Sequence, residues 1–126
     1  MKTLKAFVAT FAVFLSLTGA AQAQVPIPEP TQDPSAPYRL FRTQNIYMFL
    51  LLDTRTGQIS QVQWSTQTES RFASSLNPKP LVLDGKAGRF TLYPTQNIYT
   101  FLLLDQVTGN SWQVQWGKDR LIIPIE

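Results

Sequence analysis

Two stretches of the chain share one order of apolar and polar positions. Residues 38–65 and 90–117 are identical at 17 of 28 aligned positions, displaced by 52 residues throughout. Each stretch passes from a short aromatic segment into an apolar run, a turn and an alternating run. An apolar run, a turn signal and an alternating run together predict a β-hairpin. The identity of the two copies indicates an internal duplication.

Three strands are predicted in each copy. The first is short and aromatic, and the second is apolar on both faces, as in a strand covered from both sides. The third alternates, with Trp112, Val114 and Trp116 on one face and Gln113 and Gln115 on the other. The predicted ranges are 38–41, 46–53 and 58–64 in the first copy, and 90–93, 98–105 and 111–116 in the second.

The turn in each hairpin has a defined chemistry. Asp53 and Asp105 begin the two turns, and Gly57 and Gly109 end them. An aspartate side chain can accept hydrogen bonds from turn amides, and glycine supplies the positive φ that closes a type I turn with a bulge. These four residues are therefore predicted to have structural roles.

Further strands are expected after each hairpin. Residues 120–125 are apolar and β-branched, and a weaker counterpart lies near 71–76. Residues 81–90 are expected to form a strand and a glycine-containing turn that leads into the second copy. No stretch after residue 23 has helical periodicity over ten or more residues.

The predicted fold is all-β. It has about eight short strands, arranged as two tandem antiparallel repeats of three to four strands. A lone sheet with apolar faces would leave one of them wet, so the repeats are expected to pack as a pseudo-two-fold sandwich or a small barrel. One domain is expected over 38–126, with the repeats at 38–76 and 89–126.

The N-terminal residues have the order of a secretory signal peptide. A basic start containing Lys2 and Lys5 precedes the apolar run 6–17, and Ala21-Gln22-Ala23 has the small-residue cleavage pattern. We expect residues 1–23 to be removed and the protein to be exported, either to the periplasm or outside the cell. No later apolar run is long enough for a membrane span in the mature chain.

Proline dominates the next segment, 24–37, which contains five prolines. Proline fixes φ and has no backbone donor, so the segment is expected to be an extended arm. A spacer is the favoured interpretation, and a proline-rich ligand for a partner is the alternative.

Charge and cysteine content exclude some classes of protein. The chain has 11 basic and 8 acidic residues, and removal of Lys2 and Lys5 leaves a net charge of 9 − 8 = +1. This charge and the expected export argue against nucleic acid as a partner. The absence of cysteine in an exported domain of this size favours a bacterial protein stabilised by its core.

Two resemblances follow from the repeat. The hairpin motif Leu-Asp-x-x-Thr-Gly with a following Trp (Leu104, Asp105, Thr108, Gly109 and Trp112) resembles the repeat hairpin of quinoprotein-type β-propellers, over about eight residues per copy. With its TQNxYxFLLLD repeat, nearly the whole mature chain resembles uncharacterised small exported proteins of Gram-negative bacteria. That resemblance implies export and no particular activity.

The residues offer little for catalysis. The chain has no histidine and no cysteine, so no catalytic residue, metal site or cofactor is predicted. The Leu-Leu-Asp segments ending at Asp53 and Asp105 resemble those of aspartic proteases. In that family, however, Thr or Ser and Gly follow the aspartate directly, whereas two residues intervene here. A small carboxylate-dependent hydrolase is the least favoured function.

Aromatic and amide side chains are the candidates for a binding surface. Flat rings cover the C–H faces of sugars and peptides, while amides bond their polar groups. The same residues are also typical of a core and of turns. The favoured function is a non-enzymatic binding module for a glycan or a protein, and self-assembly into a structural homo-oligomer is the alternative. The candidate residues are Thr43, Gln44, Asn45, Tyr47, Trp64, Thr95, Gln96, Asn97, Tyr99, Trp112 and Trp116.

Overall fold

The computed structural model describes residues 27–126. The chain divides into two units, Met1–Thr31 and Gln32–Glu126. In the first unit only residues 27–31 are described, and these form neither helix nor strand. The expected signal peptide, 1–23, lies outside the described residues. Within 27–126, no helix has the length and apolar character that a membrane crossing needs.

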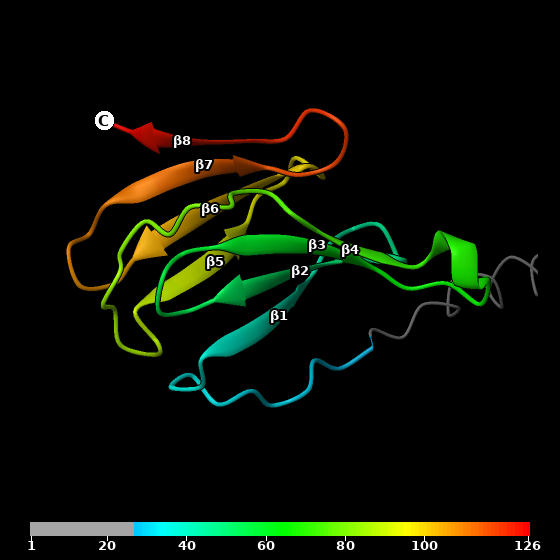
Figure 1. Ribbon diagram of the computed structural model, residues 1–126, viewed down its shortest axis with the longest axis horizontal. Coiled ribbons are helices and arrows are strands. Elements are labelled where there is room, and N and C mark those ends of the chain that lie inside the picture. Colours follow the sequence, from blue (N-terminus) through cyan, green and yellow to red (C-terminus); the bar gives the residue numbers. More distant parts are fainter. Residues whose placement is uncertain (1–26) are drawn as a thin grey trace, which may run out of the picture. The chain divides into compact units, whose positions relative to one another are not determined.

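The second unit confirms the predicted all-β class. Its strands form two antiparallel four-stranded sheets, in the orders β1-β2-β3-β4 and β5-β6-β7-β8 (Figure 1). A single 3₁₀ turn, Thr68–Ser70, precedes β4. The strands are β1 (Tyr38–Arg42), β2 (Met48–Asp53), β3 (Ile59–Gln63), β4 (Phe72–Ser75), β5 (Phe90–Pro94), β6 (Thr100–Asp105), β7 (Ser111–Gln115) and β8 (Leu121–Ile125).

One expected strand is absent from the described structure. Residues 81–84 form a loop instead, in which the Leu81 amide donates to the Thr56 carbonyl at 2.8 Å and the Leu83 side chain is exposed. The Leu81 amide thus bonds to the turn between β2 and β3, and not to a neighbouring strand. The expectation of a strand at the start of 81–90 is therefore wrong.

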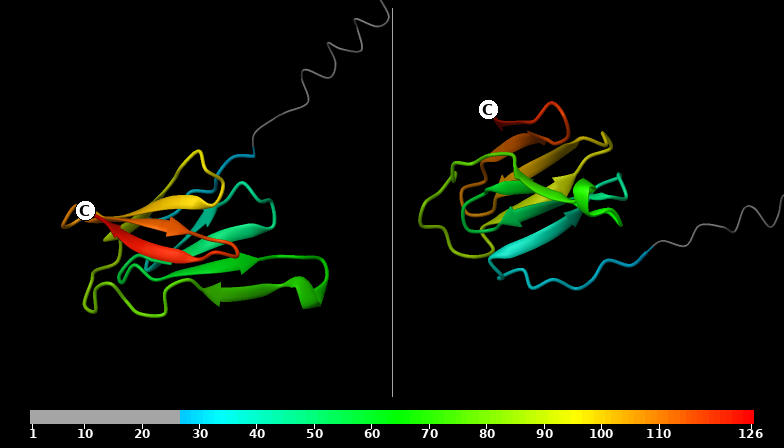
Figure 2. Two further views of the ribbon diagram at one scale, coloured as in Figure 1. Left: turned by 90° about the horizontal axis from the view of Figure 1, so that it is seen from above. Right: turned by 45° about the vertical axis from the view of Figure 1, so that its right-hand side comes forward.

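The two sheets pack against each other and share one core (Figures 1 and 2). A sandwich is therefore formed, and the barrel expected as its alternative is not. Each sheet lies on the other through one face only. The core comprises Met48, Leu50, Leu52, Ile59, Phe90, Leu92, Phe101, Leu103, Val114 and Trp116.

The two repeats bury opposite faces. Leu50 on β2 is fully buried, whereas its counterpart 52 residues later, Leu102 on β6, is 37% exposed. Conversely, Leu103 is fully buried, while its counterpart Leu51 is half-buried on the side of β2 that faces away from the core. The face of the repeat that is buried in the first sheet is thus the face that is exposed in the second sheet.

This inversion determines the internal symmetry. A two-fold axis would place the same face of both repeats in the interface, so the expected pseudo-two-fold relation is corrected to a head-to-tail stacking of equivalent sheets. The prediction that the second strand is covered on both sides is also wrong. In β2 and β6, buried residues alternate with half-buried or exposed ones.

The free edge of β1 is partly covered by the segment before it. The Gln32 side-chain amide accepts a hydrogen bond from the Leu40 N–H at 2.8 Å and donates to the Leu40 carbonyl at 3.0 Å. This is the bonding that a neighbouring strand would offer. At the opposite edge of the second sheet, β8 contains Pro124, which has no N–H. Both features oppose strand addition at these edges.

Gly57 and Gly109 give a matched pair for a stability test. Both have φ of +81°, a conformation that costs an alanine about 1 kcal/mol. A Cβ on Gly57 would lie 2.9 Å from Leu81 Cδ1 and 3.2 Å from a ring carbon of the buried Phe90, whereas a Cβ on Gly109 meets nothing within 4 Å.

Gly57→Ala is therefore expected to destabilise the protein by about 1–2 kcal/mol more than Gly109→Ala, because only the first crowds the core. Urea unfolding of both variants measures the difference. Equal losses would show that the loop around Leu81 moves aside without cost.

Candidate functional site

The Thr-Gln-Asn triplets fold the loops between the first two strands of each repeat. Thr43 Oγ1 donates to the Met48 carbonyl at 2.7 Å and accepts from the Asn45 N–H at 3.1 Å. Asn45 Oδ1 accepts from the Tyr47 N–H at 2.8 Å. The same three bonds recur 52 residues later. The threonine hydroxyl and the asparagine Oδ1 are thus bonded within the loop, while Gln44 and the equivalent Gln96 are exposed.

The two triplet loops lie at the same end of the sandwich. They line a single hollow of about 230 Å³, whose wall is apolar at Ile98 and Phe101 and polar at the triplets. The structure therefore brings together four of the six triplet residues that the sequence singles out, whereas Asn45 and Gln96 do not line the hollow. The lining residues are Arg42, Thr43, Gln44, Pro94, Thr95, Asn97, Ile98 and Phe101.

The aromatic candidates form one exposed pair in the first repeat. The rings of Tyr47 and Trp64 lie 5.0 Å apart between centroids, and Trp64 Nε1 donates to the Ile46 carbonyl at 2.8 Å. Trp64 is 45% exposed. Its indole N–H is therefore already bonded, and an open ring face remains for contact with another molecule.

The equivalent pair in the second repeat has the same geometry and a different environment. Tyr99 and Trp116 are again 5.0 Å apart, and Trp116 Nε1 donates to the Ile98 carbonyl at 3.0 Å. Trp116 is only 3% exposed because it belongs to the common core. Trp112 is half-buried and lies 6.1 Å from the Phe90 ring. Trp112 and Trp116 thus lie on the inner face of the second sheet.

The turn aspartates are held by amides and arginines. Asp105 accepts from the Val107 N–H at 2.9 Å and forms two hydrogen bonds of 2.9 Å with the guanidinium of Arg89. Burial raises the pKa of Asp105, but Arg89 and the turn amides outweigh burial and hold this pKa at about 2. Asp53 pairs with Arg55 at 3.0 Å, and its pKa is also lowered, although burial opposes the effect of Arg55.

These two carboxylates do not have the environment of a catalytic dyad. A dyad shares one proton between two neighbouring carboxyl groups, which raises one of the two pKa values. Here Asp53 and Asp105 are each paired with a different arginine, and the pKa of each is lowered. Among residues 27–126, no three acidic side chains gather into a group that could hold a metal ion.

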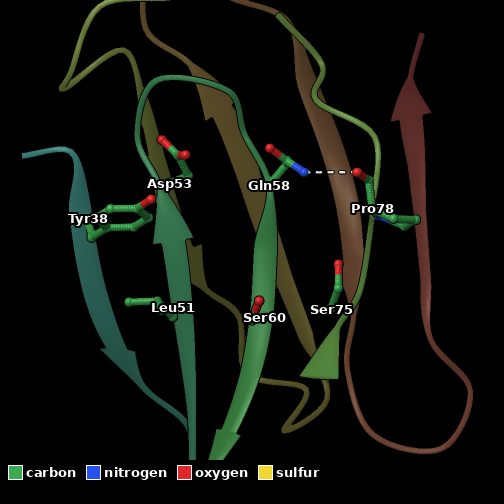
Figure 3. A pocket seen from close by; sticks show the side chains of 7 residues that line it. All are labelled: Tyr38, Leu51, Asp53, Gln58, Ser60, Ser75 and Pro78. Carbon is green, nitrogen blue, oxygen red and sulfur yellow. Dashed lines mark hydrogen bonds between the residues drawn. The ribbon is translucent and has the colours of Figure 1, made fainter. Parts of the chain in front are cut away.

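The outer face of the first sheet carries a second hollow, of about 400 Å³ (Figure 3). Side chains from all four strands surround it, with Tyr38 and Leu51 on one side and Ser60 and Ser75 on the other. A hydrogen bond of 2.9 Å from Gln58 to the Pro78 carbonyl closes one end. Asp53 also lines it.

Sequence reasoning did not identify this outer face. Its members are Tyr38, Leu40, Arg42, Phe49, Leu51, Asp53, Ser60, Val62, Ala73 and Ser75, which alternate along paired strands and therefore point to one side. Tyr38 and Leu40 are exposed, while Phe49, Leu51 and Val62 are half-buried. We call this set, with Trp64, the outer face of sheet 1.

The outer face of the second sheet is defined in the same way. It comprises Thr91, Tyr93, Thr100, Leu102, Leu104, Ser111, Gln113, Gln115, Leu121, Ile123 and Ile125. Tyr93, Leu102, Ile123 and Ile125 are exposed. We call this set the outer face of sheet 2.

Comparison of the chain with protein-family models, curated proteins and solved structures finds no match.

Proposed function

We propose that the protein is an exported, non-enzymatic interaction module that binds a partner through the outer face of sheet 1. One observation carries the proposal: the sheet exposes large apolar and aromatic side chains on the side away from the core. Tyr38, Leu40 and Trp64 are each more than 40% exposed there. Apolar patches of this kind on a soluble protein mark interaction sites.

The chemistry of this face suits a polypeptide surface. Leucine, valine and phenylalanine side chains share this face with a hollow, lined by Leu51, that also presents the hydroxyls of Tyr38, Ser60 and Ser75. Apolar side chains gain most from covering another apolar surface, and hydroxyls can both donate and accept at its polar points. A glycan would use chiefly the aromatic rings, so it is the second class of ligand to test.

The bonding of the carboxylate in the hollow agrees with this proposal. Asp53, the one carboxylate in the hollow, is paired with Arg55 and bonded to a turn amide at 3.0 Å. Its lowered pKa suits an acceptor that stays ionised. The expected export would place this binding face in the periplasm or outside the cell.

The binding test uses tryptophan fluorescence with acrylamide as quencher and a panel of envelope proteins, peptides and glycans as probes. Trp64 is the most exposed of the three tryptophans, so a Trp64→Phe variant identifies its signal. A true partner is expected to protect Trp64 from quenching. The Leu51→Asp substitution is expected to lower the affinity for that partner by about tenfold or more.

Leu83→Asp is the matched control, because Leu83 is exposed in the loop between the sheets and is not on the outer face. It should leave binding unchanged. A partner whose affinity is insensitive to Leu51→Asp would contradict the proposed surface, as would a Trp64 that is protected neither by any probe nor by a rise in the concentration of the protein itself.

A further inference from the structure

The interface between the two sheets is formed by one face of repeat 1 and by the opposite face of repeat 2. Its first half is the face of repeat 1 that carries Leu50 and Leu52, and its second half is the face of repeat 2 that carries Phe101 and Leu103. Because the repeats are equivalent, each half also exists a second time in the molecule, on an outer face.

The outer face of sheet 1 repeats the second half of this interface. Five of its apolar residues are identical to core residues 52 positions later: Leu40 and Leu92, Phe49 and Phe101, Leu51 and Leu103, Val62 and Val114, Trp64 and Trp116. All five later copies are buried against the first sheet, whereas Leu40 is 42% exposed and Trp64 is 45% exposed.

The outer face of sheet 2 repeats the first half. Leu102 and Leu104 are identical to the fully buried Leu50 and Leu52, and Gln113 and Gln115 are identical to Gln61 and Gln63. Leu102 is exposed. The two outer faces therefore repeat the two halves of the internal interface, and they are expected to fit each other as those halves do.

The positions that form one polar contact in the internal interface also recur on the outer side of each sheet. The buried Gln61 accepts a hydrogen bond of 2.6 Å through Oε1 from the Gly117 N–H, which follows β7. Gln113 occupies the position of Gln61 on the outer face of sheet 2, and Ser65 occupies the position of Gly117 after β3. A Gln113 side chain docked on the next copy would meet the Ser65 backbone.

We propose that a second copy of this chain docks head-to-tail, with the outer face of its sheet 1 on the outer face of sheet 2 of the first copy. This inference rests on the proposed function and names its partner. The contact continues the stacking already present within each chain. Because it joins two different surfaces, it is heterologous and builds a closed ring or an open filament.

The contact between copies is weaker than the one within a chain. At the position of the buried Met48 the outer face of sheet 2 has Thr100, and at that of Ile59 it has Ser111. The outer face of sheet 1 has Ser60 in place of Trp112. Each exchange removes apolar area, so association is expected to be reversible and to depend on concentration.

The test measures mass by sedimentation on the full chain, expressed with its own N-terminal segment and purified as the cell processes it. The mass is expected to rise above that of one chain as the concentration increases. A plateau at a whole number of chains identifies a ring, and growth without a plateau identifies a filament.

Two charge variants separate the faces. Leu40→Asp disables the outer face of sheet 1, and Leu102→Asp disables the outer face of sheet 2; both side chains are exposed in the single chain, so both variants can fold. Each is expected to remain a monomer. Mixed in equal amounts, they are expected to form a dimer that grows no further, since each variant keeps the face that the other lacks.

Leu83→Asp, with the same charge change in the loop between the sheets, should associate like the unmodified chain. An unmodified chain that remains monomeric throughout would overturn self-association, as would a mixture of the two variants that does not dimerise. If a foreign probe still protects Trp64 in that monomer, the proposed interaction face stands and only its partner is wrong. If no probe does, both proposals fail.

Discussion

Replacing Leu50 by alanine is expected to lower the free energy of unfolding by about 3–4 kcal/mol, whereas the same replacement at Leu102 costs less than about 1 kcal/mol. The two leucines have the same position in the two repeats, but Leu50 is fully buried between the sheets and Leu102 faces outward. Truncation of a fully buried leucine removes its transfer free energy and leaves a cavity, while an exposed one is already in contact with water.

Urea unfolding of both variants, at a concentration where the chain sediments as a monomer, measures the contrast. A second pair of variants, Leu103→Ala and Leu51→Ala, tests the same contrast, but here the residue of the second repeat is the buried one. Leu103 is fully buried, and Leu51 is half-buried on the outer face. The first of these should again cost more. Similar losses for Leu50 and Leu102 would mean that the sheets do not stack head-to-tail.

The fold class could be predicted because its signals are local. The alternation in 111–116 and the apolar runs before each turn fix the strands to within one or two residues. Because each turn follows an Asp-x-x-x-Gly pattern, the two hairpins are determined by consecutive residues. The strand expected after residue 80 failed because the pairing of an apolar segment depends on what lies beside it.

The buried face of each repeat could not be predicted from one copy. In β2 and β6 a run of three leucines makes both faces apolar, so periodicity does not distinguish inside from outside. A comparison of the copies contains the missing signal. The inward positions of Met48 and Ile59 hold Thr100 and Ser111 in the second repeat, as expected if those positions face water there.

The candidate site shows the same limit. Trp64 and Trp116 lie in identical local sequences and make the same bonds to their loops, yet one is exposed and the other is in the core. Exposure is set by whether the other sheet covers the residue. The triplets came close to one another for a similar reason, since the stacking of the sheets brings both loops to one end.

Asp105→Asn is expected to destabilise the protein by about 2–3 kcal/mol near neutral pH. The Asp105 side chain is almost fully buried and forms two bonds of 2.9 Å with Arg89. Asparagine keeps the size but loses the charge, so the turn amides lose a carboxylate and Arg89 loses its counter-ion. Asp53→Asn is the matched control and should cost about 1 kcal/mol or less, because Arg55 is much more exposed than Arg89.

The pH dependence of stability gives this prediction a second readout. The pKa of Asp105 is about 2 in the folded protein, below its ordinary value of 3.8. A lowered folded pKa adds stability that is fully present above the unfolded pKa and is lost as the pH falls through the folded one. The unmodified protein should thus lose about 2 kcal/mol between pH 5 and pH 2 through this residue, and Asp105→Asn should lose less over that interval. Urea unfolding at a series of pH values measures both slopes. Parallel slopes would show that the Arg89 pair does not hold the turn, and that the second hairpin owes its stability to the core beneath it.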